Sequence, residues 1–322
     1  MRTLDLERWR AFDAAHPAPT FFARPAWALA LERSASHYAA EALMTGRART
    51  PTTLLPVMRV RERSFPWVRF VAHPMGGYTA VLREDGAVAD EAQTQAALCE
   101  LWDTCDHAEI VLWPFSGCAQ TGRSLVRQRT THAIDLAEGA EAALSRFKGV
   151  TRRMVGQAER RGLRCGIERG PQAIDTYYAM LHEEAVGRWG LSAPSISRRL
   201  LEAVVHFGGD DVEIWIARYN GEAVAGGVVL YGSSESFFWS AAMRHQFSAL
   251  RPSNALNARL IRAAADRGLR WYNLGSSEEI PGVIRFKESL GAVPFAYAFV
   301  EYDSSRYRLY GKVRGAVRAL TG

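Results

Sequence analysis

The chain has 322 residues, of which 48% are hydrophobic and 23% charged, and its formal net charge is +6. This composition is typical of a folded soluble protein with room for two domains. No apolar run reaches the roughly 18 residues of a membrane-spanning helix, and the N-terminal sequence MRTLDLERWRAFD carries acidic residues that a secretory signal lacks. We therefore expect a cytoplasmic protein with no transmembrane segment.

The cysteines and charges narrow the class of protein further. The four cysteines form no CxxC pair, and the spacing of Cys105, His107 and Cys118 fits no common zinc pattern, so we expect reduced thiols and no metal. Residues 146–169 hold eight basic and two acidic side chains, and residues 306–318 hold five basic ones and no acid. Such clusters attract RNA, phosphorylated substrates or acidic lipid surfaces, or they are solvated helix faces.

The first part of the chain predicts a mixed α/β pattern. Amphipathic spacing indicates helices, and alternating apolar residues indicate strands. The predicted helices cover residues 3–15, 21–33 and 90–105, and the predicted strands cover 37–44, 54–63, 68–72, 109–115 and 126–136. No catalytic motif is recognisable in this part of the chain.

The second part continues the same pattern. A basic helix is predicted over 138–161, then a strand over 162–168 and helices over 173–186 and 195–205. Asn220-Gly221 is a strong hairpin signal between strands 212–219 and 223–231. A strand over 295–302 and a basic helix in residues 304–322 close the chain.

The region from 236 to 290 is the best candidate for chemistry. A strand over 236–243 precedes a helix that starts after Pro252, where Ser253 or Asn254 can cap it, and Gly268 can end it. A strand over 269–274 follows, which predicts a βαβ unit. The helix N-terminus would then lie near the carboxyl end of the first strand, where α/β sheets usually hold ligands.

Lys287 lies in a short helix that follows this unit. Val283, Phe286 and Leu290 form an apolar stripe, and Lys287 is beside it. The lysine could reach a cleft, or it could be a snorkelling side chain whose stem covers apolar surface; spacing alone favours the second interpretation.

Four motifs together resemble one known superfamily. They are Arg188-Trp189-Gly190-Leu191, Arg251-Pro252-Ser253-Asn254, Tyr272-Asn273-Leu274-Gly275-Ser276, and Phe286-Lys287 followed by Leu290-Gly291. The chain is similar to the Fem-type peptidyltransferases, which carry two GNAT (N-acetyltransferase) domains in tandem. The resemblance implies an α/β fold with mixed sheets and two such domains: a degenerate one over residues 1–133 and a second over 134–303, followed by the basic tail helix 304–322.

The resemblance also implies the site. Lys287 would be catalytic and would stabilise an oxyanion or the leaving oxygen, because an ammonium puts full charge where charge develops. Arg188 would grip a phosphate or carboxylate, or it would simply pair with a nearby carboxylate. The residues expected to bind donor or substrate are Arg188, Trp189, Arg251, Ser253, Asn254, Gly275, Ser276 and Phe286.

The implied reaction is the transfer of an acyl group to an amine, with no tightly bound cofactor and no metal. The resemblance favours an aminoacyl-tRNA donor and implies a small-molecule or cell-wall precursor acceptor. Asn254 and Leu256 stand where acetyl-CoA-dependent members carry glycines, which weakens the case for an acetyl-CoA donor. An acyl-CoA-dependent N-acyltransferase is the alternative, and a non-catalytic protein that binds RNA or an anionic surface is a further one. The basic tail could contact a membrane peripherally.

Overall fold

The computed structural model describes residues 1–46, 52–61, 66–72, 74–116, 122–188, 190–277 and 279–321, with side chains described as far as residue 313. The chain forms two compact units. The first unit comprises Met1–Arg129 and Ala296–Gly322, and the second comprises Thr130–Phe295. In the described part no helix is long and apolar enough to cross a membrane.

In the part of the first unit that is described, a mixed sheet is accompanied by four α-helices. Its strands have the order β1-β2-β3-β4-β6-β13, and β5 pairs with β3. Only the β4–β6 pair is parallel among the pairs described in this unit. The elements are β1 (Arg2–Leu4), α1 (Leu6–Ala15), α2 (Pro25–Ser34), β2 (Tyr38–Thr45), β3 (Thr53–Val60), β4 (Arg69–Val71), β5 (Leu82–Arg83), α3 (Glu91–Trp102), β6 (His107–Val111), β13 (Val293–Asp303) and α10 (Ser305–Thr321).

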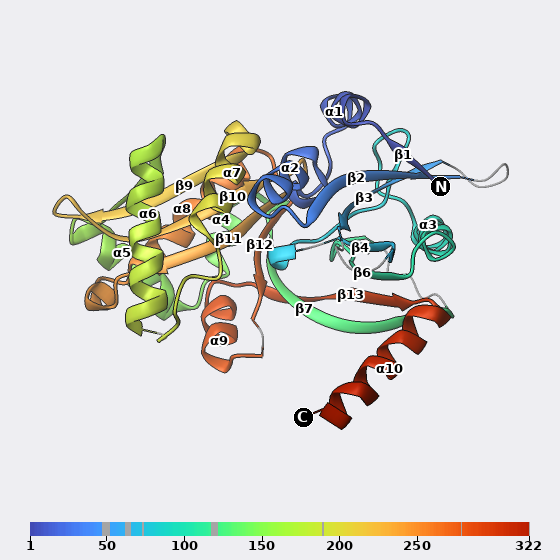
Figure 1. Cartoon of the computed structure of the whole chain (residues 1–322). Coiled ribbons are helices and arrows are strands. Elements are labelled where there is room, and N and C mark those ends of the chain that lie inside the picture. The colour runs from blue at the N-terminus through green and yellow to red at the C-terminus, as the bar shows by residue number, and fades with distance from the viewer. Residues whose placement is uncertain are drawn as a thin grey trace. The chain divides into compact units, whose positions relative to one another are not determined.

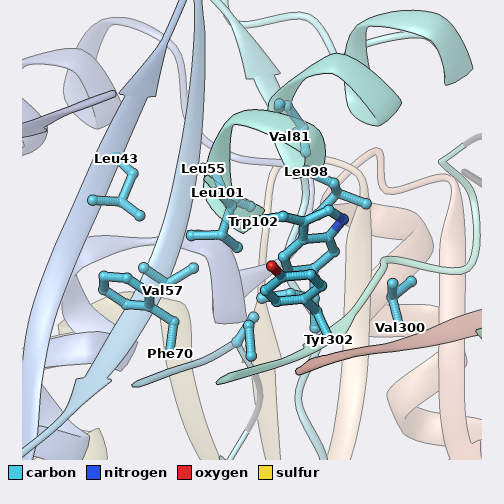
Figure 2. Close-up of a cluster of buried hydrophobic side chains, with 14 of the residues drawn as sticks. Leu43, Leu55, Val57, Phe70, Val81, Leu98, Leu101, Trp102, Val300 and Tyr302 are labelled. Atoms are coloured by element: carbon cyan, nitrogen blue, oxygen red, sulfur yellow. The ribbon is translucent and has the colours of Figure 1, made fainter. Parts of the chain in front are cut away.

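The core of the first unit contains residues from both ends of the chain. Trp102 of α3 stacks on Tyr302 of β13, with ring centroids 4.7 Å apart, among buried aliphatic side chains from the sheet (Figure 2). Because residues 299–303 of β13 pair with β6, residues 296–322 group with the first unit. The sequence had placed residues 134–303 together, since a local pattern does not reveal which sheet a late strand enters.

The start of α10 is fixed to the first unit by charges. Arg306 forms an ion pair with the buried Asp106. His107 places Nδ1 2.7 Å from Asp303 Oδ1 and Nε2 3.4 Å from Glu109 Oε1, and its ring stacks on Tyr307. Burial disfavours the charged imidazole, but the two carboxylates outweigh it and raise the pKa of His107.

The second unit is a six-stranded mixed sheet with helices on both faces (Figure 1). Its order is β7-β12-β11-β10-β9-β8, in which only β11 and β12 are parallel among the described pairs. The elements are β7 (Leu125–Asp135), α4 (Gly139–Ser145), α5 (Gly149–Arg160), β8 (Arg164–Glu168), α6 (Pro171–Glu183), a π-helical turn (Glu184–Arg188), α7 (Arg198–Gly208), β9 (Val212–Tyr219), β10 (Glu222–Tyr231), β11 (Glu235–Met243), α8 (Pro252–Asp266), β12 (Trp271–Ser276) and α9 (Pro281–Ser289).

The central hairpin of this sheet forms as its sequence predicts. Asn220 and Gly221 have φ values of 50° and 82°, which are the positive angles that a two-residue hairpin turn requires. Both faces of β9 and β10 are buried, because α8 packs on one face and α6 with α7 on the other. At Gly226 a Cβ would lie only 3.1 Å from the methyl group of Met180 in α6, so glycine permits close packing there.

The single basic helix predicted over 138–161 is wrong, because two helices, α4 and α5, occupy this stretch. Phe147, between them, is buried in the core, and the Lys148 N–H donates to the carbonyl of Ser289, 3.0 Å away. The guanidinium of Arg152 donates to the carbonyls of Ser145 and Phe147. These contacts stabilise the break, and periodicity cannot reveal them because each involves the folded arrangement of neighbouring segments.

Candidate functional site

The βαβ unit predicted near the end of the chain is present as β11, α8 and β12. The two strands pair in parallel over Glu235–Phe237 and Trp271–Asn273, and β11 then continues to Met243. Since α8 connects the carboxyl end of β11 to β12, its N-terminus lies at the same edge of the sheet as the carboxyl ends of both strands. Open α/β sheets bind their ligands at this edge.

A bulge bends the carboxyl end of β12. Asn273 pairs with Ala133 and Ser276 with Thr131, so β12 has one residue more than β7 between these pairs. Gly275, in the bulge, has φ 73°, an angle that glycine adopts without strain. The backbone N–H of Gly275 donates to the side chain of Asn273 over 2.9 Å. The bulge directs the carbonyls of Gly275 and Ser276 toward α9.

Lys287 of α9 binds to these two carbonyls. Its Nζ donates to Gly275 O over 2.8 Å and to Ser276 O over 2.7 Å, and the residue is only 6% exposed. The spacing of α9 had favoured a lysine that snorkels into water; that interpretation is wrong, because the amine is buried and bound to backbone. Its positive charge therefore lies at the carboxyl end of β12.

A buried polar network supports the bulge from the other side. Asn273 is fully buried; its Oδ1 accepts a hydrogen bond from Thr131 Oγ1 at 2.7 Å, and its Nδ2 donates to Glu235 Oε1 at 2.6 Å. Glu235 is 1% exposed, at the start of β11. The motif Tyr272-Asn273-Leu274-Gly275-Ser276 includes Asn273, but the expected site residues include neither Asn273 nor its partners. An asparagine inside the apolar strand WYNLG was a visible signal, since asparagine is depleted in strands.

His132 of β7 is a titratable group close to Lys287. It is buried, and its Nδ1 lies 3.2 Å from Ser277 Oγ. Burial lowers the pKa of His132, and the charge of Lys287 lowers it further, while Glu288 acts in the opposite direction. A neutral imidazole beside a buried ammonium avoids repulsion between two cations.

The N-terminus of α8 differs from the expected cap. Neither Ser253 nor Asn254 caps the helix: Ser253 Oγ lies 3.5 Å from Met243 Sδ, and Asn254 is buried in the first turn. The N-cap is Arg251, whose φ of 57° is uncommon for a residue with a side chain and costs about 1–2 kcal/mol. Pro252 has no N–H, and the N–H groups of Asn254 and Ala255 donate to Arg251 O, so this helix end offers few free donors to an anion.

Arg188 is connected to the same edge of the sheet by the carboxylate of Glu184. Its Nη1 is 3.2 Å from Glu184 Oε1, and Glu184 Oε2 accepts the backbone N–H of Met243 at 2.9 Å. Arg188 is therefore paired with a carboxylate at the end of β11 and remains partly exposed. Trp189 lies outside the described residues.

Phe286 has a different environment from the other predicted residues. Its side chain packs against the apolar core formed by α8, β12 and their neighbours. Lys287, Gly275 and Ser276 are brought together, and Arg251, Ser253 and Asn254 form the start of α8, while Phe286 helps to hold α9 in place. Within the described ranges, no group of three His, Cys, Asp or Glu side chains is close enough to hold a metal ion.

Comparison with known proteins identifies the fold. Residues 145–288 match the acetyltransferase (GNAT) domain family. The structure of FemX superposes with a TM-score of 0.70 at 12% identity, over 97% of this chain and all of FemX. No curated protein matches the sequence.

Two further solved structures have the same fold. A conserved protein of unknown function from Bacteroides thetaiotaomicron superposes with a TM-score of 0.64 at 11% identity, over 94% of this chain and all of that one. The C-terminal domain of a protein assigned as a lysylphosphatidylglycerol synthetase from Agrobacterium fabrum gives 0.58 at 11% identity, over 94% and 93% of the two chains.

Proposed function

We propose that this chain, an acyltransferase of the GNAT superfamily with a Fem-like fold, forms an amide bond by transferring an aminoacyl group from aminoacyl-tRNA to an amine acceptor. In this reaction the amine nitrogen attacks the ester carbonyl carbon, and a tetrahedral oxyanion forms. The carbon–oxygen ester bond then breaks, and the proton lost by the amine is balanced by the proton that the leaving hydroxyl gains.

The observation that carries this proposal is the position of Lys287. Its ammonium is buried at the carboxyl end of β12, at the edge where the N-terminus of α8 also lies. Two carbonyls fix the amine in place, so its charge needs no reorganisation when an oxyanion develops nearby. A fixed cation in a water-poor site stabilises such charge more strongly than the same cation in water.

The choice of donor rests on two features. Asn254 lies in the first turn of α8, where glycine would let a pyrophosphate approach the backbone N–H groups more closely, and Leu256 is buried in the core in the next turn. Lys148, Arg153, Arg160 and Arg169 are exposed, and in the described part of the chain no carboxylate lies within ion-pair distance of them. Exposed cations of this kind favour a polyanion such as tRNA.

The acceptor in this proposal is an amine of a peptidoglycan precursor, as the likeness to FemX suggests. The name lysylphosphatidylglycerol synthetase, carried by another protein of this fold, refers to a lysyl group joined to a lipid. That name is consistent with the aminoacyl transfer proposed for this chain.

The donor is tested by offering both candidates to the same protein. Thermal unfolding is recorded with deacylated tRNA and with CoA, because a ligand that binds only the folded state raises Tm. Transfer is then measured with aminoacyl-tRNA and with acyl-CoA, using an amine-bearing peptidoglycan peptide as acceptor. If CoA but not tRNA raises Tm, and acyl-CoA but not aminoacyl-tRNA supports transfer, the acyl-CoA-dependent enzyme is favoured instead.

The role of Lys287 is tested with Lys287→Met and Lys287→Arg. We expect the Met variant to lose about 10²–10³-fold in kcat, the usual effect of removing one oxyanion-stabilising group. Arg285→Gln is the matched control, because Arg285 is an exposed cation on the same helix. If Lys287→Met folds and turns over at the wild-type rate, the lysine only attaches α9 to β12. A protein that binds tRNA without any turnover would support the non-catalytic alternative.

A further inference from the structure

A cavity of about 300 Å³ lies among α4, α5 and α8 in the second unit. This volume is at the lower end of the range for ligand-binding pockets. Its floor is apolar and its rim is charged. The lining residues are Glu141, Leu144, Ser145, Phe147, Arg152, Val155, Glu159, Ala258, Arg259 and Arg262.

The rim contains three arginines and two glutamates, which leaves one positive charge in excess. Arg262 is paired with Glu141, and Arg259 Nη2 lies 3.2 Å from Glu159 Oε1. Each of these pairs has no net charge, and together they connect α8 to α4 and α5. The excess positive charge therefore belongs to Arg152.

Arg152 is held in position by backbone rather than by a carboxylate. Its Nη1 donates to Ser145 O at 2.7 Å and to Phe147 O at 2.5 Å. Among the described residues, Nε and Nη2 of Arg152 have no hydrogen-bond partner. A guanidinium that is fixed on one side and has donors left on the other is suited to a carboxylate, which accepts two parallel N–H bonds.

From this arrangement we propose that the cavity binds a small amphipathic carboxylate, with its apolar chain on Leu144, Phe147, Val155 and Ala258 and its carboxylate on Arg152. The apolar floor keeps water away from the hydrocarbon of the ligand, and one anion neutralises the single excess positive charge. A ligand with a positive head group would instead meet three arginines.

This cavity is separate from the site proposed for acyl transfer. Its lining comes from α4, α5 and the middle of α8, whereas Lys287 and the carbonyls that hold it belong to α9 and β12. The inference therefore does not depend on the proposed function. It can be tested by binding alone, with no donor or acceptor present.

The probe is octanoate, measured by isothermal titration calorimetry on the full chain, with 1-octanol and octylamine as neutral and cationic probes of the same chain length. Arg152→Gln removes the charge that would bind the carboxylate, and Ala258→Phe fills the cavity. Arg153→Gln is the matched control, because Arg153 is exposed on the same helix and does not line the cavity. Thermal unfolding establishes that each variant is folded.

We expect saturable binding of one octanoate per protein chain. Binding should be at least about tenfold weaker in Arg152→Gln, which loses one charge-assisted contact, and in Ala258→Phe, which loses the space for the hydrocarbon of the ligand. Arg153→Gln should bind as the wild type does, and octylamine should not bind. The proposal is overturned if octanoate shows no saturable binding, if Ala258→Phe binds it equally well, or if Arg153→Gln weakens binding as much as Arg152→Gln.

Discussion

Replacing Asn273 by alanine tests the buried network that supports the bulge of β12. The asparagine is fully buried and makes three hydrogen bonds: it accepts from Thr131 Oγ1 and the Gly275 N–H, and it donates to Glu235 Oε1. Alanine removes all three at once. The partners stay buried, because Thr131 and Glu235 are 0% and 1% exposed.

The magnitude follows from these orphaned groups. Each buried polar group left without a partner costs about 1–3 kcal/mol. Because the groups are adjacent and can adjust together, we expect a total of about 3–5 kcal/mol rather than the full sum. In a domain of this size 1 kcal/mol lowers Tm by about 2–4 °C, so Tm should fall by about 6–20 °C.

The assay is urea unfolding followed by tryptophan fluorescence, with thermal unfolding as a second measure. Asn257→Ala is the matched control: Asn257 is also buried, but it makes two side-chain hydrogen bonds, one with Tyr272 OH and one with Ser253 O. We expect its loss to be smaller, at about 1–3 kcal/mol. Asn273→Ala should also reduce transfer, because Asn273 holds the backbone whose carbonyl binds Lys287.

The reasoning would be refuted by a loss below about 1 kcal/mol for Asn273→Ala, the net value of a single ordinary hydrogen bond. It would equally fail if Asn257→Ala were as destabilising as Asn273→Ala. Either result would mean that water or a local shift satisfies the partners of Asn273.

Three further predictions concern other parts of the chain. Although burial disfavours the charged form of His107, nearby carboxylates raise its pKa. Its contribution to stability is therefore full below about pH 6.5 and is lost as pH rises through the raised pKa. Urea unfolding at mildly acidic and mildly alkaline pH should show this loss, and His107→Gln should abolish the difference. Burial raises the pKa of Cys105 to about 12 and that of Cys165 to about 11, so both thiols should alkylate slowly in the native protein and rapidly in urea, and fast native labelling would contradict this. Gly227→Ala should destabilise by about 1–3 kcal/mol in urea unfolding, because the added Cβ would collide with the ring of Phe238, and an unchanged midpoint would contradict this.

The local elements of the site could be predicted because their signals are local. Pro252 and Gly268 predicted the two ends of α8: the helix begins at Pro252, and Gly268, just after its end, has φ 73°. Asn220-Gly221 predicted its hairpin for the same reason, since turn geometry depends on the residues in the turn.

The break between α4 and α5 shows the limit of such local signals. The helical period continues across residues 145–149, yet the chain breaks there because Phe147 enters the core and the Lys148 N–H meets a carbonyl of α9. The free energy by which each residue favours a helix is smaller than the free energy gained by burying one aromatic side chain, so the tertiary contact prevails.

The sequence by itself determined most helices and strands of the second unit, though not the break between α4 and α5, and it selected Lys287, Gly275 and Ser276 as residues of interest. Only the tertiary structure decided that the lysine is buried on the carbonyls of the β12 bulge, and that Asn273 connects Thr131 to Glu235 beneath it. The physical reason is distance along the chain: periodicity is set by neighbouring residues, whereas a buried charge or amide is placed by partners that only folding brings within hydrogen-bond distance.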